Sequence, residues 1–207
     1  LHSLRRRLAS VVFKRQRTGR GGSDDVRKKT ACDVSTQWRT DWPSPPGSFV
    51  MDDVYRAWAT WEKERTQEAQ QVLLERAAVA CAQFRACPTE HDAPAVWAWA
   101  MRVVRAWLDY EGRIDPRKED VREARAQHAD VVRATLGILR NASLSDAYAC
   151  QALAHTDTLA QLCAMCVAYE RMSEPALLVM IRVLTQLLVN LVTRHEAVRD
   201  TLWTLLA

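Results

Sequence analysis

The sequence reads Ile138-Leu139-Arg140-Asn141 at the end of one long apolar stretch and Leu187-Leu188-Val189-Asn190 at the end of another, 49 residues later. After each copy come a short polar turn and a second apolar stretch, and the same shift places Ala149 on Val198. A unit of this kind cannot bury its apolar face alone, so neighbouring units stack. The pattern therefore predicts a helical solenoid in the second half of the chain.

The composition favours helices along the whole chain. Strand-forming residues are sparse, Ala, Leu, Arg, Glu and Gln are frequent, and only six glycines interrupt 207 residues. A chain of this length builds one sizeable core or one stack of helical repeats. We therefore expect an all-α protein with one helical repeat domain at residues 49–207, preceded by a basic, Gly- and Pro-rich and largely disordered arm at residues 1–48.

Start and stop signals divide the helical part into segments. One helical pattern runs from Met51 to Phe84 without an obvious break. A second begins after Asp92, a predicted N-cap, and ends at Gly112, where we expect a left-handed residue. A third is expected to start at Asp115.

The later segments become shorter and more apolar. The third pattern is predicted to be charged and solvated through Arg125 and to turn apolar at Val131. Short helices are expected over 147–153 and 159–169, the run Ser173-Glu174-Pro175 is a strong helix start, and a last segment spans 196–206. Residues 51–112 could be true repeats or an accessory bundle.

The charge is distributed unevenly along the chain. Residues 1–30 carry ten Lys or Arg against Asp24 and Asp25, a net charge of +8, and the whole chain has +4, so the remainder has +4 − 8 = −4. An acidic body offers no broad cationic surface for a phosphate backbone, and we expect no specific nucleic-acid binding by the folded part. The arm either contacts RNA, acidic lipid or an acidic partner, or is simply solvated.

Signals for membranes and compartments are few. No apolar run approaches the roughly 20 residues that cross a bilayer, since Arg or Glu interrupts the long patterns, so no transmembrane segment is expected. Residues 1–15 are Arg-rich and lack acids, as in a mitochondrial transit peptide. Because the chain begins at Leu1 and not at Met, a fragment is favoured over a transit peptide. Six Cys without regular spacing suggest reduced thiols in the cytoplasm.

One aromatic residue stands apart from the apolar stripe of its helix. Trp97 and Met101 belong to that stripe, whereas Trp99 falls on another side together with Arg102 and Arg105. A large aromatic ring beside two guanidinium groups suits a partner-binding anchor, which makes Trp99 and Arg102 candidates. The alternative is that the ring packs on a neighbouring helix.

Catalytic and metal chemistry find little support in the sequence. The five His lie in expected loops or on polar helix faces, and no Gly-rich elbow accompanies a Ser or Cys, so no enzyme is expected. Cys163, Met165 and Cys166 are soft ligands that suit Cu(I) or Zn(II). Structural zinc needs four ligands, and His155 is the only histidine nearby. Two buried thiols on one helix face are therefore expected, without metal or cofactor.

The residues from Leu136 onward resemble the armadillo-like region of the ataxin-10 family, whose fungal members carry a copper-transport name. The likeness covers residues 136–207 and lies in Leu139-Arg140-Asn141-Ala142, in Leu184-Thr185-Gln186-Leu187-Leu188-Val189-Asn190-Leu191, and in Glu196, Val198 and Leu202-Trp203. The family's characteristic C-terminal domain is absent from this sequence, which fits a partial chain.

The resemblance implies an armadillo-like α-solenoid acting as a cytoplasmic scaffold without enzymatic activity, linked to cytokinesis in some members and to neuronal growth in others. In armadillo repeats the Asn at the end of the long helix often lines the concave groove and hydrogen-bonds a partner's backbone, so Asn141 and Asn190 are candidates for partner binding. The alternative is that each amide caps its own helix end. A copper-handling protein and an adaptor acting through the basic arm are the other hypotheses.

Overall fold

The computed structural model describes residues 49–86, 92–115, 118–169 and 174–205, and the regular structure of these residues is entirely helical. The all-α prediction is therefore confirmed for the described part of the chain. The predicted arm at residues 1–48 lies outside the described residues. The helices are α2 (Phe49–Glu64), α3 (Gln67–Ala86), α4 (Ala93–Glu111), α5 (Glu119–Ala142), α6 (Asp146–Ala149), the 3₁₀ helix η1 (Cys150–His155), α7 (Thr156–Tyr169), α8 (Pro175–Arg194) and α9 (Glu196–Leu205).

The helical pattern from Met51 to Phe84 is two helices, and the expectation of one unbroken segment was wrong. The chain turns at Arg65, whose φ of 54° is in the left-handed region. Thr66 then opens α3, because its Oγ1 accepts a hydrogen bond from the Ala69 amide at 3.2 Å. The sequence has no glycine or proline at this turn, so the usual signal for a helix break was missing.

The ends of the next two helices agree with the sequence only in part. Asp92 is the N-cap of α4 as predicted, since its Oδ1 accepts from the Ala95 amide at 3.3 Å. Gly112 is not left-handed, because its φ is −68° and it ends α4 in helical geometry. The following helix, α5, begins at Glu119 and not at Asp115.

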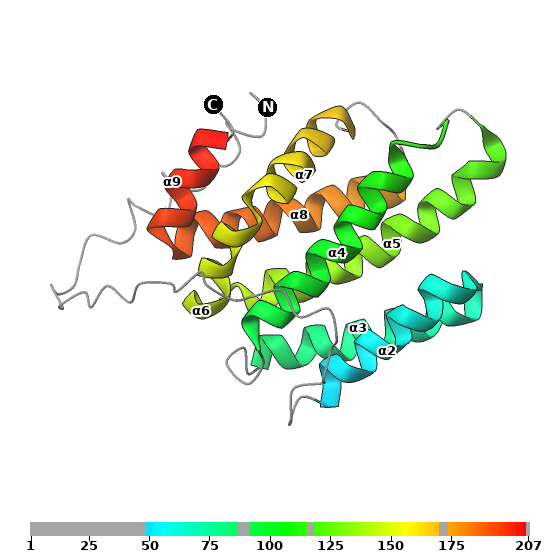
Figure 1. Ribbon diagram of the computed structural model, residues 1–207, viewed down its shortest axis with the longest axis horizontal. Helices are drawn as coiled ribbons and strands as arrows, with labels where there is room; N and C mark the ends of the chain where they lie inside the picture. The colour runs from blue at the N-terminus through cyan, green and yellow to red at the C-terminus, as the bar shows by residue number, and fades with distance from the viewer. Residues whose placement is uncertain (1–48, 87–91, 116–117, 170–173, 206–207) are drawn as a thin grey trace, which may run out of the picture.

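The three longest of the described helices, α3, α5 and α8, form a row in which α5 packs against both α3 and α8. Side-chain contacts show that the row is parallel. Gln70 near the start of α3 reaches Gln127, and Cys81 further along α3 reaches Asn141 further along α5. In Figure 1 the pairs α2 with α3, α4 with α5 and α7 with α8 follow one another from the bottom of the view to the top.

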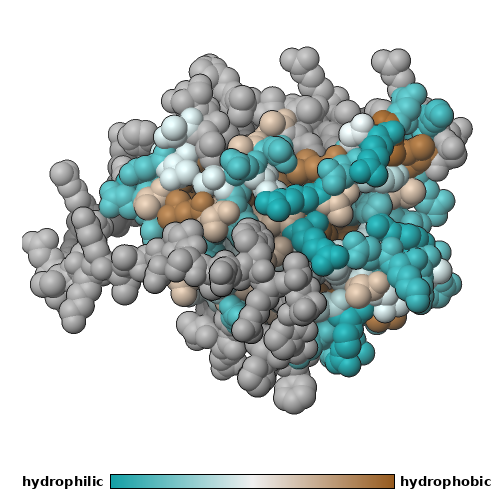
Figure 2. Space-filling model, in the orientation of Figure 1, coloured by the Kyte–Doolittle hydropathy of each residue, from teal (hydrophilic) through white to brown (hydrophobic). Residues whose placement is uncertain are grey.

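Tryptophans fill the space between the first two helix pairs. The indole rings of Trp58, Trp61, Trp97, Trp99 and Trp107 are all at most 5% exposed, and they come from α2 and α4. Each large ring removes much apolar surface from water, which is the main favourable contribution to folding. In the view of Figure 2, hydrophilic side chains cover much of the described surface where α2 and α3 lie.

The helix α8 is long and strongly apolar. By length and composition α8 is sufficient to cross a membrane, with a mean hydropathy of 1.9 over its window, although Arg182 interrupts it as expected. The same test is passed by core helices. In the structure Leu184, Leu187, Leu188 and Leu191 are buried, and α8 contacts α5, α6, α7 and α9.

One charged residue lies deep in the fold. Arg125 was expected on a solvated part of α5, but its side chain is only 2% exposed. It donates from Nε and Nη2 to the two carboxylate oxygens of Glu111, each at 2.8 Å, and from Nη1 to Glu174 at 2.8 Å. Glu111 is the last residue of α4, and Glu174 directly precedes α8. The bonds of Arg125 therefore join α5 to the end of α4 and to the start of α8.

Candidate partner-binding face

The chain contains two asparagines, and both make the same contact. Asn141 in α5 donates from Nδ2 to the Cys81 carbonyl of α3 at 2.7 Å. Asn190 in α8 donates from Nδ2 to the Arg140 carbonyl of α5 at 2.8 Å. Each amide therefore ties its own long helix to the preceding long helix of the row. Since Asn141 is only 5% exposed, its bond lies in a largely dry environment where losing it is expensive.

A polar network continues from this contact to the surface. Arg140 donates from Nε to Asn141 Oδ1 at 3.1 Å and from Nη1 to Gln186 Oε1 at 2.7 Å. The guanidinium thus fixes the orientation of the buried amide and connects it with an exposed residue of α8. Arg140 and Gln186 stand in the repeated stretches of the sequence, yet sequence reasoning proposed neither as a site residue. The signal that could have identified them is that Arg140 directly precedes Asn141 and that Gln186 lies one helical turn before Asn190.

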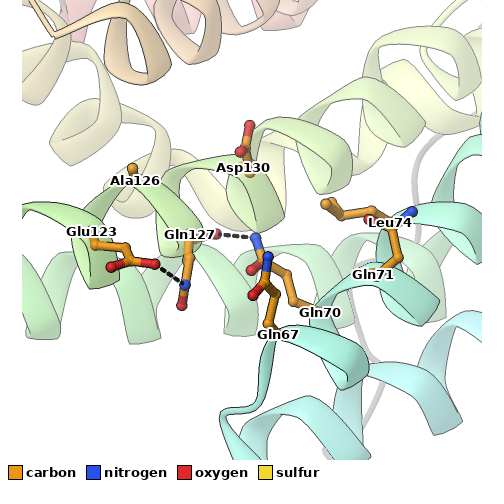
Figure 3. A pocket seen from close by; sticks show the side chains of 8 residues that line it. All are labelled: Gln67, Gln70, Gln71, Leu74, Glu123, Ala126, Gln127 and Asp130. Atoms are coloured by element: carbon orange, nitrogen blue, oxygen red, sulfur yellow. Dashed lines mark hydrogen bonds between the residues drawn. The ribbon is translucent and has the colours of Figure 1, made fainter.

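A polar cleft lies between the first half of α3 and the middle of α5, near the start of the row. It encloses about 300 Å³, and amide groups predominate on its walls (Figure 3). The lining residues are Gln67, Gln70, Gln71, Leu74, Glu123, Ala126, Gln127 and Asp130. Sequence reasoning missed this cleft, because its two walls are 57 residues apart at the Gln70–Gln127 contact.

The cleft is rich in hydrogen-bond acceptors. Gln70, only 6% exposed, donates from Nε2 to the Gln127 carbonyl at 3.1 Å. Glu123 accepts a long bond of 3.5 Å from the Gln127 side chain, and Asp130 pairs with Arg133 at 3.0 Å. The two carboxylates give the cleft a preference for donors and cations.

The other two predicted site residues lie on α4, away from the asparagine contacts. Trp99 is 4% exposed, and its ring lies 5.5 Å from that of Tyr55 in α2, so the structure favours packing on a neighbouring helix over an exposed anchor. Arg102 is exposed, with its guanidinium 4.8 Å above the Trp58 ring and 3.7 Å from Glu62. The structure does not bring these residues together with Asn141 and Asn190.

A second cluster surrounds a histidine. His128 of α5 contacts the ring of Trp61 at 4.8 Å, the ring of Tyr110 at 4.5 Å and the guanidinium of Arg65. Burial, reinforced by the positive charge of Arg65, lowers the pKa of His128 to about 4. The expectation that the histidines lie in loops or on polar faces was therefore wrong for His128, and also for His155, which is buried and stacks on Trp97.

The sulfur residues give no assembled metal site in the part that the structure describes. Among those residues, no three His, Cys, Asp or Glu side chains gather closely enough to hold an ion. Cys163 is 1% exposed, and burial raises the pKa of its thiol to about 12, which disfavours the thiolate that binds metals. The side chains of Met165 and Cys166 lie outside the description.

Comparisons with known proteins add no relative to this picture: no family model, no curated protein and no solved structure matches the chain. The resemblance to the ataxin-10 family therefore stays a prediction.

Proposed function

We propose that the chain is a non-enzymatic, cytoplasmic protein-binding scaffold, built as an armadillo-like α-solenoid of the ataxin-10 type. The observation that carries the proposal is the repeated asparagine contact between consecutive long helices. Two equivalent bonds at a spacing of 49 residues are what a stack of equivalent units produces, because each unit meets the next in the same way. Roles in cytokinesis or cell growth follow from the resemblance alone.

The parallel row supports a repeat more than a simple up-and-down bundle. Neighbouring helices in such a bundle are antiparallel and joined by short loops. Here Arg125 contacts Glu174 near one end of the α5–α8 pair and Arg140 contacts Gln186 further along, so the two helices run in the same direction. Between consecutive helices of the row the chain runs back through helices outside the row. These are α4 between α3 and α5, and α6 with α7 between α5 and α8.

We assign partner binding to the exposed surface of the row formed by α3, α5 and α8. It presents polar side chains of different kinds, including the amides of Gln71 and Gln186 and the partly exposed Arg133. Such a surface suits the backbone of an extended peptide, since amide groups can both donate and accept. Asn141 itself is nearly buried, so direct contact with a partner falls to its exposed neighbours.

Selection of peptides from a displayed random library on the full-length protein tests this assignment. We expect selected peptides to lose about tenfold or more in affinity for the double variant Arg133→Ala, Gln186→Ala, because truncating contact residues of an interface costs more than about 1 kcal/mol each at its centre. The matched control is Asp109→Ala, Asp157→Ala, which truncates exposed residues of α4 and α7. If both variants bind every selected peptide equally well, the row is not the binding face.

A further inference from the structure

Exposed apolar side chains gather on the two end helices of the row. Among the described residues, the large ones are Val72 and Val79 of α3, Leu178 and Val179 of α8, and Leu144 after α5. The helices α3 and α8 are the ends of the row, since α5 packs against both. The ends of a solenoid normally carry a polar outer face that keeps the protein soluble. Apolar side chains at both ends therefore indicate that these ends pack against something else.

One face of each long helix, here called the forward face, packs on the next long helix of the row. On α5 it runs from Arg125, which binds Glu174 just before α8, to Arg140, whose carbonyl accepts a hydrogen bond from Asn190 of α8. The residues between these two at helical spacing are fully buried, and they are Ala129, Val132 and Leu136.

The two asparagine contacts place the three long helices in register. Asn141 and Asn190 relate α5 to α8 by 190 − 141 = 49 residues, and their acceptor carbonyls, on Cys81 and Arg140, relate α3 to α5 by 140 − 81 = 59 residues. The equivalent forward-face residues are Gln70, Leu73 and Ala77 on α3 and Leu178, Ile181 and Thr185 on α8. Those of α3 are buried, whereas Leu178 is 45% exposed and the other two residues of α8 are partly exposed.

A different face of α5, here called the rear face, receives α3. Its contacts with α3 involve Gln127, Ala134 and Asn141. Val131 and Ile138 lie between these residues at helical spacing, and both are at most 1% exposed. The 59-residue shift relates them to Val72 and Val79 of α3, which are 47% and 51% exposed. The rear face of α3 therefore presents two valines to solvent, with Arg76 between them.

The forward face of α8 and the rear face of α3 are the two halves of a joint that the chain already makes twice, between α3 and α5 and between α5 and α8. We propose that copies of this chain join head to tail, with α8 of one copy packing in parallel on α3 of the next. The row of long helices then continues from copy to copy, and the exposed apolar residues of both ends become buried.

Charge at the two ends supports this pairing. Leu74 of α3 and Gln127 of α5 line the same cleft at the joint within the chain (Figure 3). The 59- and 49-residue shifts together relate Leu74 to Arg182 of α8, and the 59-residue shift relates Gln127 to Glu68 of α3. Arg182 and Glu68 are both exposed. In a joint of the same geometry between copies they meet as opposite charges, which favours this partner and this register.

Sedimentation velocity of the full chain over a series of concentrations tests the joint. We expect the unmodified chain to form assemblies that grow with concentration, because a head-to-tail contact does not close on itself. Leu178→Asp blocks only the forward face of α8 and Val72→Asp only the rear face of α3, so each variant alone should associate at least about tenfold more weakly. An equimolar mixture of the two should form a dimer and nothing larger, since each pair of chains has one intact face of each kind.

Charge reversal tests the register of the joint. Arg182→Glu and Glu68→Arg should each weaken association about tenfold, because like charges then face each other. Mixing these two variants should restore association, since every joint between unlike copies again pairs opposite charges. The matched controls are Arg122→Glu and Asp157→Arg, which reverse exposed charges outside the two faces and should change nothing.

Three outcomes overturn the proposal. The unmodified chain stays monomeric up to about 1 mM, Val72→Asp associates as strongly as the unmodified chain, or the mixture of Leu178→Asp with Val72→Asp stays monomeric. Thermal unfolding of all variants checks that the fold is retained, as expected for substitutions at exposed positions. Association of copies does not require the row to bind a peptide, so the library selection and the sedimentation experiment can fail independently.

Discussion

At the scale of single residues, buried and half-buried polar side chains make the contacts that join the helices. The two asparagines hold carbonyl groups of neighbouring helices, and the buried Arg125 joins Glu111 to Glu174. The sequence pointed to the asparagines through the repeat, but it assigned them to a partner or to their own helix ends. Nothing local to Arg125 showed that it would be buried, because its carboxylate partners are 14 and 49 residues away.

The asparagine contacts are tested by replacing the donating amide with a carboxylate, which can only accept. Asn141→Asp and Asn190→Asp keep the shape of the side chain but place a carboxylate oxygen against the carbonyl of the preceding helix. We expect a loss of about 2 to 3 kcal/mol in the free energy of unfolding for Asn141→Asp, whose site is nearly dry, and about 1 kcal/mol for the half-buried Asn190→Asp. Urea unfolding measures both. Gln186→Glu, which keeps the acceptor for Arg140, is the control and should change little.

The buried ion pairs of Arg125 predict a large asymmetry between two similar substitutions. Arg125→Met leaves Glu111 and Glu174 without their shared cation, and we expect it to cost about 3 kcal/mol or more. Arg133→Met removes an exposed pair with Asp130 and should cost about 0.5 kcal/mol or less. Chemical denaturation of the two variants gives the comparison. Similar losses in both would show that Arg125 is not buried.

The environment of His128 predicts a dependence of stability on pH. Its folded-state pKa of about 4 lies below the ordinary value of 6.5, so the unfolded chain takes up a proton first as the pH falls. The contribution of His128 is complete above pH 6.5, is lost between about pH 6.5 and 4, and does not change further below that. Because the side chain is partly exposed, we expect a loss of about 1 to 2 kcal/mol and not the full value of the shift.

Carboxylates also titrate in the lower part of this window, so His128→Gln serves as the reference. The free energy of unfolding of the unmodified chain should fall more steeply from pH 7 to pH 4.5 than that of His128→Gln. Parallel curves for the two proteins would mean that His128 takes up its proton equally in both states.

At the scale of helices, the sequence predicted the elements better than their ends. The N-cap at Asp92 and the helix start at Pro175 agree with the structure, since both depend on local chemistry. The turn at Arg65 was missed because a non-glycine residue adopts the left-handed conformation there. The Arg65 guanidinium contacts His128, 63 residues away, and no sequence window contains both residues.

Gly112 offers a direct test at this scale. In the structure it has helical φ, and a Cβ would meet only the Leu108 and Asp109 carbonyls at 3.5 and 3.8 Å, which are ordinary contacts. Gly112→Ala should therefore raise the free energy of unfolding by about 0.5 kcal/mol, because alanine restricts the unfolded chain more than glycine does. A left-handed residue at this position, as the sequence suggested, would make the same substitution destabilising by about 1 kcal/mol.

At the scale of the whole molecule, the order of the helices follows from the pairing of α3, α5 and α8. The all-helical class was evident from composition, and the 49-residue repeat placed Asn141 and Asn190 at equivalent positions. The cleft and the α3 contact of Asn141 were not evident, because the first half of the chain shows no matching copy in sequence. The place of α3 in the row depends on the packing of Gln70 and Cys81 against α5.

The central claim is that consecutive long helices run parallel in one row. Electron spin resonance distances between spin-labelled non-natural residues, which leave the six native cysteines in place, test it most directly. With one label at Gln71 on α3, the account predicts about 20 Å to a label at Leu178 near the start of α8 and over about 30 Å to one at Arg194 at its end. The reverse order of the two distances would place α8 antiparallel to α3, as in a closed bundle, and would contradict the account.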